Sequence, residues 1–241
     1  MAIDWQRISI ALSSRLQFEM ACGRGRLISE DISRIFLAET VQSQISGAIE
    51  PEINHPDLPG NTRLDLLVRS PSAQNIEAAI EHKWVRRTGE NVGRQWMAEV
   101  LADLLRVETI SSQMVQGSER ILVVSGEVEE MRSKIWESQS RQGGGQPRVG
   151  VVNTLMQARP QSGEVQSEST TIQLRNIGRP FFKKLRHAAP ELLGQLPARY
   201  AVQLVGYHRA YAEGVECAIW KISRPGGHRS TFDAADHWPE T

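Results

Sequence analysis

The sequence has little cysteine and no net charge. Its two cysteines, Cys22 and Cys217, provide neither a disulfide framework nor a paired-cysteine zinc site in a chain of 241 residues. The six histidines are scattered and show no zinc-site spacing. Lysine and arginine balance aspartate and glutamate at 28 each, which argues against a protein that coats nucleic acid through its overall charge.

Long hydrophobic runs are also missing. No apolar stretch approaches the ~20 residues needed to span a bilayer, and the N-terminus lacks the apolar core of a signal peptide. The glycine run at 143–145 is not followed by Lys-Ser/Thr, so it is not a phosphate-binding loop. We therefore expect a reduced, cytoplasmic protein without a membrane partner.

The order of hydrophobic patterns predicts an α/β protein. Residues 1–138 predict a mixed central sheet flanked by helices. Residues 139–224 predict a C-terminal α+β extension packed on the same domain, and residues 225–241 a loosely ordered tail. The expected helices cover residues 4–20, 29–46, 94–107, 128–138 and 179–195, the last bent at Pro190; the expected strands cover 48–54, two runs within 63–84, a run from 119, 149–155, 170–175, 200–208 and 215–223.

The most informative chemistry lies between Arg63 and Trp84. Asp65 interrupts an apolar first strand, and Glu81 and Lys83 follow an apolar run in the second. Side chains alternate between the two faces of a strand, so Glu81 and Lys83 point to the same side. Buried charges are costly unless they compensate one another or hold a metal ion. A carboxylate pair beside an ammonium suits metal-assisted phosphodiester cleavage, whereas an exposed Glu-x-Lys would carry no chemistry.

The helix that follows Ser29 predicts a further acid. Ser29 is a suitable N-cap, and acids follow it in the first turn. The apolar stripe of this helix leads to Glu39 through Ile28, Ile32, Ile35 and Phe36. An inward carboxylate is either a snorkelling glutamate or a ligand directed at the sheet. With Asp65 and Glu81 downstream, we favour the ligand.

This pattern resembles the PD-(D/E)XK nuclease superfamily, which has the restriction-endonuclease-like fold. Its signature is an Asp on one strand, then Glu or Asp, any residue and Lys on the next, with a helical Glu upstream. The matching positions are Asp65, Glu81, Lys83 and Glu39, and the resemblance covers roughly residues 28–108. The literal Pro-Asp of the family name falls at Pro56-Asp57, but that pair lies in a turn, and a strand fixes a ligand better.

The resemblance implies a metal-dependent endonuclease that hydrolyses DNA, of a restriction or anti-phage type. Asp65 and Glu81 would bind Mg²⁺, or Mn²⁺ in its place, through oxygen. The main-chain carbonyl of His82 would complete the shell, while its ring packs on the opposite face. Glu39 would bind a second ion or position a water.

Two further roles concern the lysine and the helix after it. Lys83 would orient or deprotonate the attacking water, with its pKa lowered by partial burial or by the nearby cation. The helix at 94–107 would offer Gln95 to the site. The rest of its polar face, namely Glu99, Asp103 and Arg106, is expected in solvent.

Contacts to DNA phosphates are expected from two basic clusters. They comprise Arg86, Arg87 and Arg94 after the second strand, and Lys183, Lys184 and Arg186 on the late helix. Cutting both strands of a duplex usually takes two active sites, which favours a homodimer. Three alternatives stay open: a catalytically idle module that binds nucleic acid or protein, an RNA-directed nuclease, and an unrelated small-molecule site.

Overall fold

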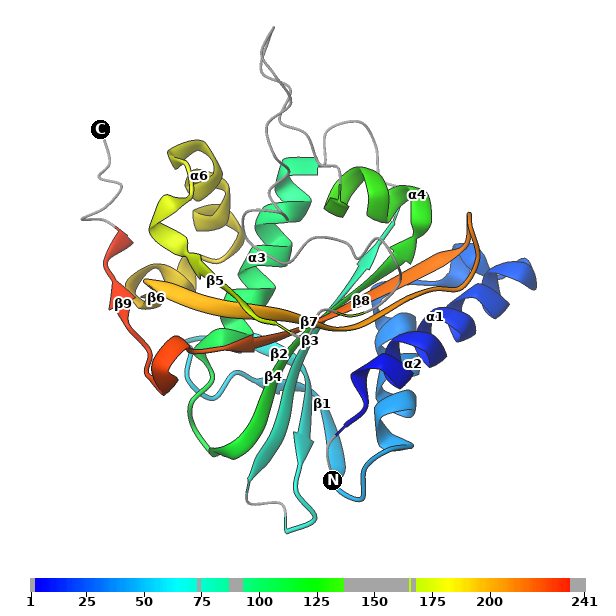
Figure 1. Cartoon of the computed structure of the whole chain (residues 1–241), viewed down its shortest axis with the longest axis horizontal. Coiled ribbons are helices and arrows are strands. Elements are labelled where there is room, and N and C mark those ends of the chain that lie inside the picture. The colour runs from blue at the N-terminus through cyan, green and yellow to red at the C-terminus, as the bar shows by residue number, and fades with distance from the viewer. Residues whose placement is uncertain (1–2, 73–74, 87–92, 137–164, 166–167, 235–241) are drawn as a thin grey trace, which may run out of the picture.

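The computed structural model describes residues 3–72, 75–86, 93–136, 165 and 168–234, and a seven-stranded sheet forms its centre (Figure 1). The strand order is β1-β2-β3-β4-β8-β7-β5. The pair β3–β4 is parallel and the other five pairs are antiparallel. The strands are β1 (Ala48–Asn54), β2 (Arg63–Arg69), β3 (Ile76–Val85), β4 (Met114–Glu127), β5 (Thr170–Gln173), β7 (Arg199–Arg209) and β8 (Val215–Ser223). The prediction of an α/β protein with a mixed central sheet is therefore confirmed.

Helices cover both faces of this sheet. One face packs on α1 (Trp5–Ala21) and α2 (Glu30–Gln42), and the other on α3 (Gly93–Thr109) and α6 (Arg179–Ala188) (Figure 1). The short α4 (Val128–Met131) continues into the π-helical turn η2 (Arg132–Trp136), where the sequence predicts one longer helix. The remaining turns are η1 (Gly25–Leu27), η3 (Leu174–Asn176), η4 (Pro190–Gln195) and η5 (Pro225–Gly227).

Local sequence explains where the helices start and stop. Asp4 and Ser29 cap α1 and α2, each accepting a hydrogen bond from a backbone N–H of the first turn. α2 ends at Gln42, four residues earlier than expected. The late helical region is divided in two: α6 ends at Ala188, and η4 begins at Pro190, which cannot continue a helix. None of the helices formed by the described residues combines the length and apolarity needed to cross a bilayer.

β3 lies at the centre of the protein and is buried on both faces. Ala78, Ala79 and Ile80 have no exposed surface, which accounts for the unbroken apolar run in this part of the sequence. Ile80 and Trp84 face α1 and α2, whereas Val85 faces α3. By the alternation of side chains, Glu81 and Lys83 lie on the α3 side with Val85.

The C-terminal strands complete the same sheet. β8 pairs with β4 over eight residues, and β7 and β5 extend the sheet beyond it. The expectation of a loosely ordered tail from Pro225 is wrong up to Ala234: β9 (Thr231–Phe232) pairs with β6 (Leu196–Pro197), and Arg229 of this segment binds Glu108 of α3. The strand predicted at 149–155 and the tail from 235 lie outside the described residues.

Candidate active site

Asp65 and Glu81 face one another across two adjacent strands. β2 and β3 pair antiparallel with Leu66 opposite Ile80, and continuing this register by one residue sets Asp65 opposite Glu81. Directly opposed residues have Cβ atoms about 5 Å apart on one face of a sheet. The two carboxyl groups interact closely enough for each to shift the pKa of the other.

The surroundings of the two carboxyl groups shift their pKa values in opposite directions. Glu81 is almost fully buried, and burial together with the charges of Asp65 and Asp103 raises the pKa of Glu81 well above its ordinary value. For Asp65, burial alone would raise the pKa. The interaction with Glu81, the hydrogen bond from the His82 amide and the charge of Arg34 outweigh burial and lower the pKa of Asp65. Asp65 is thus the stronger acid of the two, and Glu81 keeps its proton to higher pH.

Asp65 is held by charge as well as by the strand. Its Oδ2 accepts a hydrogen bond from the His82 backbone N–H at 2.8 Å, and its Oδ1 accepts one from Arg34 of α2 at 2.5 Å. Arg34 also bonds Glu52 at 2.8 Å. The β1–β2 register skips Glu52, whose backbone is left-handed with φ 49°. Such a conformation is uncommon for a residue other than glycine, and here it lies beside Asp65.

Lys83 is held between two helices. Its Nζ lies 3.5 Å from Glu30 of α2 and 3.6 Å from Asp103 of α3. Burial would lower the pKa of Lys83, but four acids raise it above its ordinary value: Asp103, Glu30, Glu99 and Asp65. The expectation that burial lowers the lysine pKa is therefore wrong, because the carboxylates outweigh the burial. The effect of a bound cation on this pKa stays a prediction. Lys83 is a fixed ammonium ion.

Asp103 is the acid that sequence reasoning missed. It lies on the polar stripe of α3, which the amphipathic pattern assigns to solvent, yet it is only 6% exposed. Burial raises the pKa of Asp103 to about 6, and the charges of Lys83 and Arg106 limit that rise. Asp103 is buried because its side of α3 packs against Lys83 of β3. No signal in the sequence marks it, because a polar stripe gives the same pattern whether it meets water or a charged strand.

Glu39 does not have the inward position predicted for it. It is exposed, whereas Ser33, Leu37 and Val41 form the buried side of α2. Two residues of helix turn a side chain by about 200°, so Glu39 lies opposite Leu37. The error came from Ile32 and Ile35, which are 37% and 52% exposed and gave the stripe a wrong phase. Among the described residues, Glu30 is the α2 acid beside Lys83.

The His82 side chain lies on the face away from the carboxyl pair. It is buried and its Nε2 lies 3.0 Å from the Ser125 hydroxyl. Burial lowers the pKa of His82 to about 4. This confirms the packed ring, while the role of its main-chain carbonyl as a metal ligand stays a prediction.

The predicted phosphate contacts are only partly described. Arg86, Lys183 and Arg186 are exposed, and Lys184 is half-buried. Arg87 and the side chains of Arg94 and Gln95 lie outside what the structure describes. α6 packs on α3, the helix that carries Asp103.

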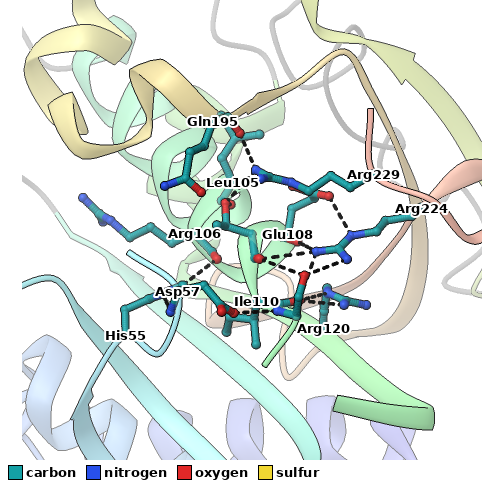
Figure 2. A network of polar contacts seen from close by, with 12 residues as sticks. His55, Asp57, Leu105, Arg106, Glu108, Ile110, Arg120, Gln195, Arg224 and Arg229 are labelled. Carbon is teal, nitrogen blue, oxygen red and sulfur yellow. Dashed lines mark hydrogen bonds and ion pairs between the residues drawn. The ribbon is translucent and has the colours of Figure 1, made fainter. Parts of the chain in front are cut away.

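Arginines fix the C-terminal end of α3 (Figure 2). Glu108 is fully buried, and its two carboxylate oxygens bind Arg224 at 3.0 Å and Arg229 at 2.8 Å. Arg224 also donates to the Glu108 and Ile110 carbonyls, and Arg120 to that of Ile110. Cations at a helix C-terminus compensate its dipole and its free carbonyls. They fix the helix on which Asp103 approaches β3.

The side chains at this site could bind a divalent ion, although they are not arranged as a metal site. Among the described residues, no group of three or more His, Cys, Asp and Glu side chains forms a metal site. However, buried Glu81 Oε1 has no hydrogen-bond partner in the described part of the chain, and such an atom is unfavourable without one. An ion could take the place of the Glu81 proton and use this oxygen. Asp65 and Glu81 therefore fit the hard ligands that Mg²⁺ prefers.

Comparisons with family models, with curated proteins and with solved structures give no match for this chain. The case for a function therefore rests on the residues themselves.

Proposed function

We propose that the protein is a metal-dependent endonuclease that hydrolyses DNA phosphodiester bonds. One observation supports this most: an acid pair, half-buried Asp65 and buried Glu81, lies on the sheet face that also carries the fixed ammonium of Lys83. The order α2-β1-β2-β3-α3-β4 agrees with the resemblance to PD-(D/E)XK nucleases. Glu30 then takes the place of the upstream helical glutamate, instead of Glu39.

The proposed role of the acid pair is to bind the ion. Asp65 would hold the ion as a carboxylate, and Glu81 would contribute its oxygens after losing its proton. When bound, the ion supplies a water of lowered pKa and neutralises charge on the phosphate. Arg34 keeps Asp65 in place through its 2.5 Å contact.

Lys83 acts through its charge. As an ammonium it can donate hydrogen bonds to the attacked phosphate, stabilise the negative charge that develops there and orient the attacking water. Hydrolysis forms a P–O bond to that water and breaks the P–O3′ bond. The water's proton ends on the leaving oxygen, and the product keeps a 5′-phosphate by the polarity that the resemblance implies.

The test is incubation of the purified protein with supercoiled plasmid, linear duplex, single-stranded DNA and RNA. Each substrate is combined with Mg²⁺, Mn²⁺ or a chelator. We expect nicking or linearisation of the plasmid with either ion and none with the chelator. Cleavage of RNA alone would replace the substrate by RNA, and no cleavage of any substrate would favour an idle binding module.

Variants separate the roles of the residues. Lys83→Met should abolish cleavage and keep the rise in melting temperature caused by Mn²⁺, because the acid pair remains. Asp65→Asn should lose both. Asp4→Asn is the matched control, since Asp4 is exposed and Asn caps a helix as well as Asp does. Unchanged cleavage by Asp65→Asn would contradict the proposal.

A further inference from the structure

A chain of ion pairs connects Lys83 to the C-terminal part of the protein. Asp103 Oδ2 lies 3.6 Å from Lys83 Nζ, and Asp103 Oδ1 accepts a hydrogen bond from Arg106 at 2.7 Å. Arg106 in turn bonds Glu191 of η4 at 2.9 Å and the carbonyl of Ala188, at the end of α6, at 3.2 Å. The chain thus runs from β3 through α3 to the segment that follows α6.

This chain leaves Asp103 little freedom. Its side chain is 8% exposed and that of Arg106 is 21% exposed. Arg106 reaches Glu191 and Ala188 from one turn of α3, and its own carbonyl oxygen lies 2.9 Å from His55 Nε2. Figure 2 shows Arg106 and His55 beside the arginine-bound end of the helix. Because Arg106 is held through both its side chain and its backbone, little further conformational entropy is lost when it orients Asp103.

Stability alone does not account for Asp103. It is buried close enough to Asp65 and Glu81 for repulsion, and apolar residues that replace a buried ion pair are often neutral or stabilising. Asp103 instead restricts where the Lys83 ammonium can lie. Asp103 of α3 lies 3.6 Å from Lys83 Nζ and Glu30 of α2 lies 3.5 Å from it, so the ammonium is held between two carboxylates from different helices.

We propose that Asp103 is a positioning residue for Lys83, and that Arg106, anchored by Glu191, fixes Asp103 in turn. This inference rests on the proposed nuclease function. Through Arg106, it makes the segment around η4 part of the catalytic unit.

The test compares Asp103→Asn with the wild-type protein and with Asp4→Asn as control. For Asp103→Asn we expect kcat for plasmid cleavage to fall by about tenfold or more, because a displaced catalytic group is slow. The KM for plasmid and the Mn²⁺-induced rise in melting temperature should stay within about twofold of wild type, since binding is left intact. Asp103→Glu should recover part of kcat.

A second readout does not depend on cleavage. In protein labelled with ¹³C-lysine, the Lys83 side-chain resonance is identified as the one missing from Lys83→Met. We expect it to move toward the exposed lysines in Asp103→Asn. Glu191→Gln changes the last member of the chain of ion pairs and does not remove a buried acid. It should move the Lys83 resonance in the same direction and lower kcat by about threefold.

The outcomes of these tests distinguish the positioning role of Asp103 from the proposed nuclease function. Equal kcat in Asp103→Asn and wild type, or a Lys83 resonance that does not move, would overturn the positioning role. Loss of the Mn²⁺ effect together with kcat would also overturn it, because Asp103 would then be a ligand or a general support of the fold. A wild-type protein that cuts nothing refutes the nuclease, and the Lys83 resonance alone then decides whether Asp103 positions it.

Discussion

At the scale of the residue, Asp65 and Glu81 differ although they face each other. The pKa of Asp65 is lowered, because Asp65 accepts hydrogen bonds from the His82 amide and Arg34, and the pKa of Glu81 is raised by burial and by the charges of Asp65 and Asp103. The sequence could predict this pair, since charges in apolar strands are conspicuous. It could not predict Asp103, because a polar stripe on a helix has the same pattern whether it faces water or a charged strand.

The acid pair should reduce stability when no ion is bound. Glu81→Gln keeps the shape and the hydrogen-bond donor of the neutral acid and cannot ionise. At pH 8 in a chelator we expect its melting temperature to exceed that of wild type by a few degrees, where about 1 kcal/mol corresponds to 2–4 °C in a chain of this size. Addition of Mn²⁺ at about 100 times its dissociation constant should stabilise wild type by about 2.7 kcal/mol.

Differential scanning fluorimetry with and without Mn²⁺ measures both effects. Glu213→Gln, in the exposed turn between β7 and β8, is the matched control. A Glu81→Gln protein that keeps the Mn²⁺ shift would show that the ion binds elsewhere.

At the scale of the element, sequence patterns predicted most helices and strands but gave the wrong buried side for α2. β1, the β7–β8 hairpin and the break at Pro190 appear where expected. α2 also exists, but its buried side follows Ser33, Leu37 and Val41 instead of the exposed Ile32 and Ile35. Phase depends on what the helix packs against, and a pattern of few apolar residues does not fix it.

The exposed basic side of α6 is predicted to contact phosphates. Replacing Lys183 and Arg186 together by Ala should weaken binding to all DNA sequences alike, because phosphate contacts carry no sequence information. The slope of log K against log salt should become shallower by about 0.9 for each phosphate that the variant no longer neutralises. Fluorescence anisotropy across a salt series measures it, with Arg7 and Arg26, both exposed on the α1 side, replaced as the control. Identical slopes would remove α6 from the interface.

At the scale of the whole molecule, the C-terminal third completes the sheet and fixes α3. Composition predicted a loose tail from Pro225, because single residues do not reveal that Arg224 and Arg229 bind a glutamate more than 100 positions earlier. Long-range ion pairs of this kind leave no local signal. The same holds for the chain from Lys83 to Glu191.

Removal of Glu108 should therefore destabilise the protein as a whole. Glu108→Gln leaves two arginines facing a neutral partner in a fully buried position. We expect the free energy of unfolding to fall by about 3 kcal/mol, measured by urea denaturation. Glu213→Gln again serves as the exposed control and should change stability by less than about 0.5 kcal/mol. A change for Glu108→Gln as small as that of the control would mean that α3 is held by its apolar packing alone.

The central claim is that Asp65 and Glu81 form an ion site that cleaves DNA. Its most direct test is the rate of supercoiled-plasmid cleavage in Mg²⁺ by folded Glu81→Gln beside wild type. The account predicts divalent-dependent cleavage by the wild-type protein and at least a roughly 100-fold lower rate for the variant, on the order of the loss expected for a group that stabilises the transition state. Equal rates for the two proteins, or cleavage by wild type that persists in a chelator, would contradict it.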